Sequence, residues 1–555
     1  MSILNLRKFL MSASVLAGVS TLAFTPQAFA QEEDEDTEEA EIEEIITTGS
    51  RIVRDTFSSI SPLQVIDGET SRDLGLVDTS ELLRQTTVVQ GQQITTGLST
   101  SAGLLTDNGP GSSTASLRGL DAGRTLVMVN GRRLAPAGVG GAPSNPDLNL
   151  VPGTLIERVD VLLDGASSVY GSDAVAGVVN IILRNDFDGL QLDAYNSWTG
   201  LSNDGGDQEV YSATWGVNND RGFIGFAAEY TKTNGFAEGD LAGFYSPYDG
   251  DCRSRIIVGA SGQSYRDNCS GSFGAGAAST SAFGFLGFEE GQNNPGLPPG
   301  FFQIPVTGSL LTSGDPGGQA LLLWPEELEA AFAPDFSRTT IFTVGEYSPG
   351  WYGDATPYFE ASWSSRKTAT NTSGQGRVRI PGDYALGNFG GLDGTLYYSS
   401  RFIRDTEVAQ TRITGGIKGD LPFMDGLGSL AGWTYDTYVS YSRSNGDDSI
   451  QGIAYYPRLE QTLSNTRFDE DSGEYVCDPR GVAGEGQQVT CRPLNFFDPT
   501  FILTGRFSDP EDNAYLYPNR ITNTVVEQTT YQGFITGELF DIGWGGPASM
   551  VLGVE

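Results

Sequence analysis

The chain has 555 residues, with 70 acidic and 33 basic side chains and a formal net charge of −37 at pH 7. A chain this negative repels nucleic acid, so a polyanionic partner is not expected. The sequence contains no histidine, which excludes Ser-His-Asp and Cys-His nucleophile arrangements, HExxH zinc sites and histidine-ligated haem.

Residues 1–30 have the pattern of a secretory signal peptide. Arg7 and Lys8 provide the charged start, Phe9 to Phe24 is mostly apolar, and Ala28-Phe29-Ala30 has the A-x-A form of a cleavage site. A membrane-spanning helix is the competing interpretation, but the apolar run is short and is interrupted by Ser and Thr. Because no later stretch has eighteen apolar residues in succession, a membrane-embedded form would have to be a barrel.

Residues 31–56 predict a disordered tether followed by a short extended segment. Gln31 to Glu44 carries ten acidic residues and no basic one, so it should remain solvated. The β-branched run from Ile45 to Thr48 follows, and Gly49-Ser50-Arg51 ends it. An extended strand beside a disordered tether is suited to pairing with the open sheet edge of another protein. The alternative is that this run is only the first strand of a domain.

Residues 57–187 predict a compact α+β domain with tight turns. Leu126 to Val129 is a short apolar run, and Asn130-Gly131 follows it, as expected for a hairpin whose turn needs positive φ. Gly177 to Leu183 has the composition of a buried strand. These features belong to the stretches STASLRGLDAGRTLVMVNGRRLAP (residues 113–136) and DGASSVYGSDAVAGVVNIIL (residues 164–183).

Three motifs in these stretches, LRGL, TLVMVNGRRL and DGASSVYGSDAVAGVVNIIL, closely resemble the plug domain of TonB-dependent outer-membrane receptors. An unrelated small α+β domain is the alternative. The resemblance implies that Glu43 to Arg51 is similar to the TonB box of this family, so a TonB-type energy-transducing protein is the expected partner. The residues expected to bind it are Glu44, Ile45, Ile46, Thr47, Thr48, Gly49 and Ser50. Only about fourteen residues precede this box after the predicted cleavage site, so we expect no signalling domain there.

From residue 188 onward, apolar and polar side chains alternate with a period of two. Tyr211, Ala213, Trp215 and Val217, for example, fall on one face of a predicted strand. An apolar face bordered by aromatic residues, opposite a polar face, is typical of a transmembrane barrel, although a soluble sandwich also alternates. The joins alternate between short turns and long loops, as in outer-membrane barrels. We predict nine strands, near residues 188–199, 208–218, 222–233, 338–347, 356–367, 405–419, 432–444, 520–540 and 548–555.

The predicted fold is therefore mainly β, with a small α+β plug domain followed by an incomplete antiparallel transmembrane β-barrel over residues 188–555. The chain stops within a predicted strand at Gly553-Val554-Glu555, whereas the large outer-membrane transporters have twenty-two strands. We expect a fragment that holds the plug and somewhat under half of the barrel. Such a piece should not insert alone, because both edges would leave backbone groups unpaired in lipid.

The four cysteines fall into two local pairs, both in predicted long loops. Cys252 and Cys269 are separated by sixteen residues, and Cys477 and Cys491 by thirteen, which does not fit CxxC metal or redox motifs. In an exported protein two loop-bracing disulfides are the favoured interpretation. A reactive thiol pair is the alternative.

No catalytic constellation is recognisable, so the chain is not predicted to be an enzyme, and no cofactor or metal site is expected. The phosphate-loop and GxSxG motifs are missing from the sequence, and residues 469–473 contain only part of a calcium loop. One residue-level hypothesis concerns Arg118 and Arg158, which would be enclosed by the barrel wall, where an unpaired cation is costly. Glu229 and Glu360, predicted to face the lumen, are candidate partners. The alternative is that the arginines reach water inside the barrel.

The resemblance implies an energy-coupled receptor in the outer membrane of a Gram-negative bacterium. A small extracellular ligand would bind the outside loops and the plug tips, and the TonB-type partner would then pull on the box and loosen the plug. The imported compound would be a scarce nutrient such as a ferric siderophore, an oligosaccharide or a vitamin. A passive structural or adhesive outer-membrane barrel is the main alternative, and a secreted enzyme on a β scaffold is disfavoured by the missing histidine.

Overall fold

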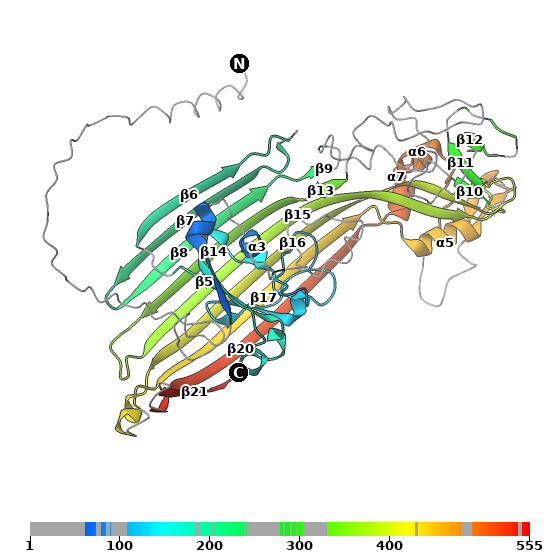
Figure 1. Ribbon diagram of the computed structural model, residues 1–555. Coiled ribbons are helices and arrows are strands. Elements are labelled where there is room, and N and C mark those ends of the chain that lie inside the picture. The colour runs from blue at the N-terminus through cyan, green and yellow to red at the C-terminus, as the bar shows by residue number, and fades with distance from the viewer. Residues whose placement is uncertain are drawn as a thin grey trace, which may run out of the picture. The chain divides into compact units, whose positions relative to one another are not determined.

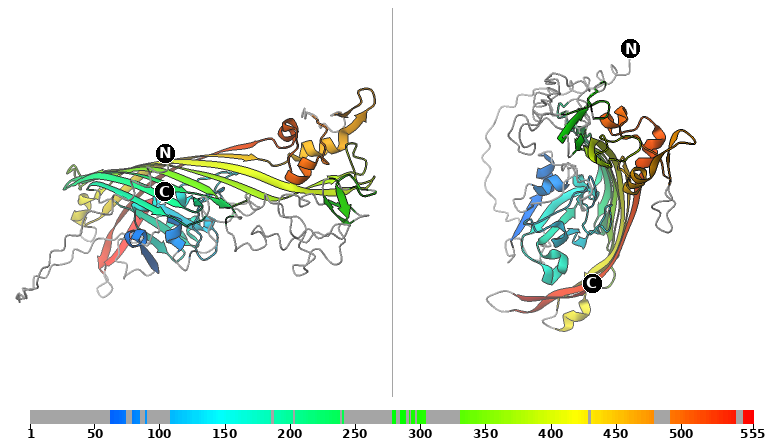
Figure 2. Two further views of the ribbon diagram at one scale, coloured as in Figure 1. Left: turned by 90° about the horizontal axis from the view of Figure 1, so that it is seen from above. Right: turned by 90° about the vertical axis from the view of Figure 1, so that its right-hand side faces the viewer.

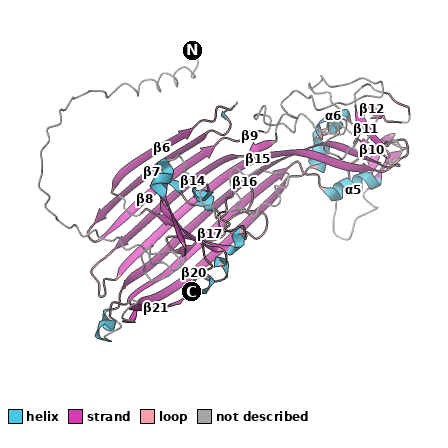
Figure 3. Ribbon diagram, in the orientation of Figure 1, coloured by secondary structure: helices cyan, strands magenta, loops and turns pink. Residues whose placement is uncertain are grey.

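The structure is a computed structural model in which strands predominate (Figures 1 and 3). Among the described residues, no helix is both long enough and apolar enough to span a bilayer. The described residues are 62–73, 79–84, 89, 108–184, 188–201, 204–237, 240, 278–280, 284–288, 291, 293–295, 297–303, 330–427, 431–478, 491–541 and 547–555.

The plug domain is built on a five-stranded sheet with the order β1-β4-β5-β2-β3. Strands β2 and β5 are parallel, and the other neighbours in this sheet are antiparallel. The strands are β1 (Leu63–Asp67), β4 (Ile156–Leu162), β5 (Gly177–Leu183), β2 (Thr125–Val129) and β3 (Arg132–Arg133). Short helices connect them: α2 (Gly68–Asp73), α3 (Thr79–Arg84), α4 (Ser167–Tyr170) and the 3-10 turns η2 (Ala122–Arg124), η3 (Leu148–Leu150), η4 (Gly153–Leu155) and η5 (Ser172–Ala174).

The predicted Asn130-Gly131 hairpin is present between β2 and β3. Asn130 has φ 50° and Gly131 has φ 74°, the positive values that a type I′ turn requires. Val178, Val179 and Ile181 of β5 are buried and Ile182 is half-buried, because both faces of this strand are covered. The apolar core of the plug includes Leu117, Val127, Val159 and Val179, and it continues into Ala227, Phe342 and Val344 of the second sheet.

A second, much larger sheet follows the plug in the chain. Among the described residues, nine long strands pair in an antiparallel series, with the order β6-β7-β8-β14-β15-β16-β17-β20-β21. Their bounds are Gly189–Ser197, Gln208–Asn219, Gly222–Thr233, Asp335–Tyr347, Thr356–Ile380, Gly394–Asp420, Thr434–Gln451, Arg520–Asp541 and Pro547–Val554. These are the nine predicted strands, and the predicted mainly-β fold with a plug domain is confirmed. Figure 2 shows that the sheet is curved and that the plug domain lies against its concave face.

The series has a short-turn end and a long-loop end. The short-turn end carries the connections β7–β8, β14–β15, β16–β17 and β20–β21, one of which contains η9 (Pro422–Leu427). The long-loop end carries the other connections. The predicted strands end near residue 367 and begin again near residue 405, but β15 and β16 remain paired from Thr356↔Lys418 to Ile380↔Gly394, so their connection is shorter than predicted.

The extended ends of β15 and β16 belong to a separate packed region at the long-loop end, which we call the outer cap. Its buried aromatic and aliphatic core includes Ile380, Tyr384, Phe389, Phe496 and Phe501. It contains β10 (Ala278–Thr280), β11 (Gly284–Phe288), β12 (Phe301–Gln303), α5 (Tyr456–Asn465), β18 (Thr466–Asp469), β19 (Glu474–Cys477), α6 (Pro499–Thr504) and α7 (Pro510–Leu516). A further short pair joins β9 (Phe236–Ala237) to β13 (Ala331–Ala333).

Candidate functional site

The candidate functional site is the contact between the plug and the inner face of the long sheet. Because successive side chains of a strand point to opposite faces, alternate positions of each long strand face the plug. Arginines occupy several of these positions and are buried there: Arg338, Arg366, Arg404 and Arg412. A buried cation requires a counter-charge and hydrogen bonds. Arg404 has both within the sheet, from Asp448 of β17 at 2.7 Å, whereas the contacts formed by the other three arginines also involve plug residues.

Among the ion pairs of the described residues, the one formed by Arg366 of β15 is the most deeply buried. Its Nε lies 2.5 Å from Oδ2 of Asp147 in the plug, and neither side chain is exposed to solvent. The other carboxylate oxygen of Asp147 accepts hydrogen bonds from the backbone N–H groups of Ser113 (3.0 Å) and Asn149 (3.1 Å). Arg366 Nη1 also donates to the carbonyl of Pro110 at 2.7 Å. One sheet arginine thus holds two segments of the plug that are far apart in the sequence.

Glu229 and Arg338 form a second buried contact. Arg338 Nη2 lies 2.6 Å from Glu229 Oε1, and each side chain is 1% exposed. Although both residues belong to the sheet, the second carboxylate oxygen of Glu229 accepts from the backbone N–H (2.9 Å) and the hydroxyl (2.6 Å) of plug residue Thr154. The Arg338–Glu229 pair therefore fixes a carboxylate oxygen that faces the plug.

Glu360 forms the third contact and binds two arginines, one from each side. Arg132 of the plug lies 2.5 Å from one carboxylate oxygen, and Arg412 of the sheet lies 3.2 Å from the other. Asn130 also donates to this carboxylate, at 3.0 Å. The guanidinium of Arg132 is 4.7 Å from the ring centroid of Tyr358 and 5.3 Å from that of Tyr438, which places a delocalised cation against two aromatic faces.

Arg132 keeps its positive charge in this position. Burial by itself lowers the pKa of the guanidinium, but the adjacent Glu360 carboxylate and Tyr358 more than offset this effect, so the pKa lies above its ordinary value. Arg132 therefore remains a cation at every physiological pH. Changes of pH within the physiological range therefore do not open the contact with Glu360 by deprotonating Arg132.

Neutral and apolar contacts complete the interface. Gln410 donates to the carbonyl of Ala135 at 3.1 Å, and the Ser364 hydroxyl donates to the carbonyl of Leu150 at 2.8 Å. Val408 of the sheet packs with Ala137 and Val139 of the plug. Polar groups of this kind can exchange their partners for water when the two surfaces separate.

The predicted pairing of Arg118 and Arg158 with the two glutamates is wrong. Arg118 donates to the carbonyl of Ala176 at 2.7 Å, within the plug. Arg158 lies 2.7 Å from Glu157 and 3.4 Å from Asp160, also within the plug. Arg158 sits on β4 between β1 and β5, so its neighbours come from the plug sheet.

Sequence reasoning identified the glutamates but missed their partners. Arg132 belongs to the NGRR motif and directly follows the predicted turn. This position in the sequence was the feature that could have indicated a role in binding. Arg338, Arg366 and Arg412 occupy plug-facing positions of predicted strands, so charge on the polar face would have indicated them. Asp147 lies in a polar loop and carried no comparable signal.

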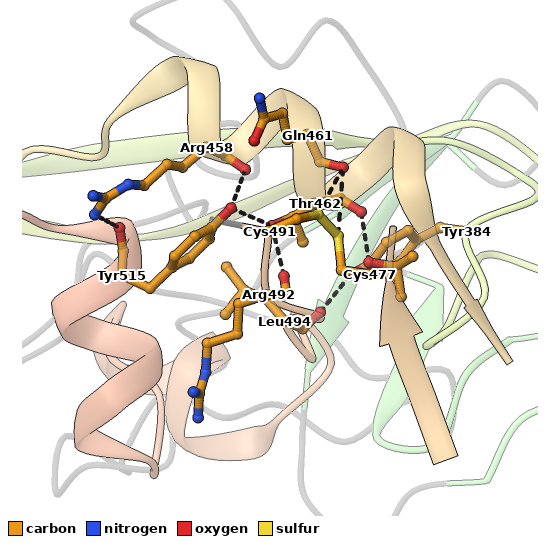
Figure 4. The surroundings of a disulfide bond; sticks show 10 residues. Tyr384, Arg458, Gln461, Thr462, Cys477, Cys491, Arg492, Leu494 and Tyr515 are labelled. Atoms are coloured by element: carbon orange, nitrogen blue, oxygen red, sulfur yellow. Dashed lines mark hydrogen bonds between the residues drawn. A yellow bond between two sulfur atoms is a disulfide. The ribbon is translucent and has the colours of Figure 1, made fainter. Parts of the chain in front are cut away.

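The predicted TonB box and the predicted disulfides do not belong to the contact between the plug and the sheet. The proposed box, Glu44 to Ser50, and the cysteine pair Cys252 and Cys269 lie outside the described residues. Cys477 and Cys491 form a disulfide in the outer cap, with their Cα atoms 5.4 Å apart. Figure 4 shows this bond beside α5, where both sulfur atoms lie within 3.8 Å of the Gln461 carbonyl oxygen.

Comparison with known proteins supports the assignment of the plug. Residues 55–178 match the family model of the TonB-dependent receptor plug domain. The chain therefore carries the plug domain of a TonB-dependent receptor, as the sequence motifs predicted.

Several solved structures of receptors are similar to this chain, at low sequence identity and low TM-score. The siderophore receptor PirA from Acinetobacter baumannii is 14% identical with a TM-score of 0.35, over 92% of this chain and 58% of that one. A mutant form of the ferric enterobactin receptor PfeA from Pseudomonas aeruginosa is 13% identical with a TM-score of 0.39, over 89% and 57%. The FpvAI–pyocin S2 complex is 11% identical with a TM-score of 0.38, over 91% and 53%. The chain spans less than two thirds of the length of each of these structures.

Proposed function

We propose that this protein is an energy-coupled outer-membrane receptor that imports a scarce nutrient by displacing its plug. The observation that carries the proposal is a plug domain seated on the polar face of a large antiparallel sheet through three buried charged contacts. The nutrient class remains a ferric siderophore, an oligosaccharide or a vitamin.

The opposite face of the sheet supports a membrane location. Its large apolar side chains are 37–54% exposed at Trp215, Ile224, Phe226, Ile341, Phe359, Trp363, Ile413 and Val439. A continuous apolar face of this size is unusual for a protein in water and marks an interaction surface. We therefore assign this face to the lipid of the Gram-negative outer membrane, with residues 188–555 as barrel and residues 57–187 as plug.

The coupling step uses the segment before the plug. We propose that residues 1–30 direct export, that residues 31–56 form a tether, and that a TonB-type protein pairs with Glu44 to Ser50. Ligand bound at the long-loop end would precede pulling at this box. Force applied along the tether would be opposed by discrete polar contacts, at Asp147–Arg366, Thr154–Glu229 and Arg132–Glu360, each of which can be replaced by water.

Deletion of residues 44–50 in the protein expressed from its own gene tests the proposal. Cells would be given isotope-labelled ferric siderophores, oligosaccharides and a cobalamin, with surface binding and uptake measured separately. We expect binding to persist and uptake of the bound compound to fall to background. A deletion of equal length in the acidic tether, residues 32–38, is the matched control and should retain uptake. Uptake that survives deletion of the box would instead favour a passive barrel.

A further inference from the structure

Two connections at the short-turn end of the sheet are joined to each other. They are the β14–β15 connection (residues 348–355) and the β16–β17 connection (residues 421–433). The backbone N–H of Asp420 donates to the carbonyl of Gly353 at 2.7 Å, and a Cβ at Gly353 would lie 3.1 Å from Cδ of Pro422. Because Gly353 also has φ 72°, both the turn and this close approach require glycine. The two connections therefore form one surface.

Three large aromatic side chains of this surface are exposed. Trp351 is 56% exposed, Tyr352 76% and Phe423 66%. Tyr352 and Phe423 are the sequence neighbours of Gly353 and Pro422, where the two connections meet. Strands β14 to β17 have both of their neighbours in the described sheet, so this exposure is not that of a sheet edge. Exposed aromatic side chains gathered on one surface mark an interaction site.

The same surface is acidic. The two connections contain no lysine or arginine, and Asp354, Asp420 and Asp425 are exposed. Among the described residues, the side chains of Asp354 and Asp420 form no hydrogen bond or ion pair, and Asp425 accepts only from the N–H of Gly432, at 3.0 Å. These carboxylates are therefore available to a cationic partner. We call the three aromatic and three acidic residues the short-turn patch.

Two basic residues lie close to the patch, and each is accompanied by a carboxylate. Lys418 pairs with Glu346 at 2.7 Å. Arg221 follows Asp220 in the β7–β8 turn, and its backbone carbonyl accepts from the N–H of Ser348 at 2.6 Å. Neither base neutralises the aspartates of the patch, so an excess of negative charge remains beside the exposed aromatic rings.

We propose that the short-turn patch binds an extended, lysine- or arginine-rich segment of a periplasmic protein. The aromatic rings would contact the cationic side chains, an arrangement that is favourable even at exposed sites, and Asp354 and Asp420 would pair with them. The same carboxylates would repel the phosphate groups of lipids, so the patch suits a basic polypeptide better than a membrane surface. The inference rests on the proposed function, which places the short-turn end in the periplasm.

Binding of a synthetic peptide of alternating lysine and serine to the detergent-purified protein tests the proposal. A peptide of alternating glutamate and serine, of equal length, is the comparison and should not bind. We expect the W351A/Y352A/F423A variant to bind the lysine peptide about tenfold more weakly. Since acidic residues elsewhere also attract lysine, the difference between variants is the readout. Tyr531→Ala removes an aromatic side chain that is 67% exposed on the outward face and should leave binding unchanged.

Asp354→Asn isolates the contribution of charge. Asp354 has φ 45°, a left-handed conformation that asparagine also adopts readily, so the turn should be kept. We expect binding to weaken about threefold and to depend less on salt. Asp471→Asn, at an exposed residue of the outer cap, is the matched control and should have no effect.

The proposal is overturned if the triple variant or Asp354→Asn binds the lysine peptide as tightly as the unaltered protein does. Loss of the triple variant from the outer-membrane fraction, with unchanged binding by Asp354→Asn, would assign the aromatic residues to the membrane surface and would also overturn it. Uptake that does not depend on residues 44–50 would overturn the proposed function without altering the peptide result, so the two failures are distinguishable.

Discussion

Asp147 and Arg366 are completely buried where the plug meets the sheet, and they form an ion pair with each other. Desolvating two ions costs several kcal/mol each, and their attraction recovers this only when the remaining hydrogen-bonding groups are also satisfied. Here the carboxylate also accepts from two backbone N–H groups, and the guanidinium also donates to the Pro110 carbonyl. Such a pair adds little net stability, but removing one member is expensive because the other charge stays buried.

Arg366→Ala should therefore lower the free energy of unfolding of the docked plug by about 3–5 kcal/mol. The readouts are thermal unfolding in detergent and the protease resistance of the plug. Arg443→Ala is the control, since Arg443 pairs with Glu527 at 3.1 Å on the exposed face, with side chains 48% and 52% exposed. That change should cost less than about 1 kcal/mol. Equal effects of the two substitutions would contradict the assigned role of Arg366.

The Arg132–Glu360 contact makes a second residue-scale prediction. A double-mutant cycle of Arg132→Ala with Glu360→Gln should give a coupling free energy of about 1–3 kcal/mol in thermal unfolding. The same cycle with Arg118→Ala should give a coupling near zero, because Arg118 donates to Ala176 within the plug. A sizeable coupling between Arg118 and Glu360 would restore the pairing that the structure rejects.

At the scale of elements, β15 and β16 run well beyond the part of the sheet that contacts the plug. Residues 368–376 contain Thr, Ser, Asn and Gly, a composition typical of loops. They are nevertheless strand, because each residue pairs in register with the β16 segment that returns from the outer cap. The cap core, including Val378, Ile380 and Leu396 at the strand ends, stabilises this pairing.

The Cys477–Cys491 disulfide should stabilise the cap and not the plug. Closing a loop of about fifteen residues contributes roughly 3 kcal/mol in the chain-entropy model. A Cys477→Ser/Cys491→Ser variant should show faster hydrogen exchange in α5 and α7, measured by mass spectrometry. Exchange in plug strands β2 and β5 is the internal control and should not change. Faster exchange throughout the plug would show that the cap and plug are more tightly coupled than we infer.

At the scale of the whole sheet, the two faces have opposite chemistry. The face toward the plug carries paired charges and hydroxyl groups, and the other face is largely aromatic and aliphatic. Water on both sides would leave the apolar face unstable, whereas lipid on that side and plug on the other satisfy both. The same arrangement explains why arginines such as Arg338 and Arg366 face the plug.

Ile413→Arg tests this arrangement. Ile413 is 54% exposed on the outward face of β16, and an arginine near the middle of a lipid-facing surface costs about 2–4 kcal/mol. We expect less folded protein in the outer-membrane fraction of cells that express the gene. Tyr352→Arg, at a residue that is 76% exposed in the β14–β15 connection, should have no such effect. Equal yields of the two variants would argue against lipid contact at Ile413.

Much of the fold was predictable because its determinants are local. The Asn130-Gly131 turn, the buried β5 strand and the two-residue alternation of β7 or β8 each depend on neighbours within a few residues. The plug motifs added the domain identity, and alternation placed Glu229 and Glu360 on the plug-facing side of their strands. In these respects the order of residues along the chain was sufficient.

The partners in the candidate site were decided only by the tertiary structure. Asp147 meets Arg366 across 219 residues of sequence, and Glu360 meets Arg132 across 228. Such distant contacts depend on how the plug is rotated against the sheet, which no local pattern encodes. The pairing of the β15 and β16 extensions likewise depends on packing in the outer cap. Local sequence therefore determined the elements and their faces, whereas burial between elements determined which charges pair.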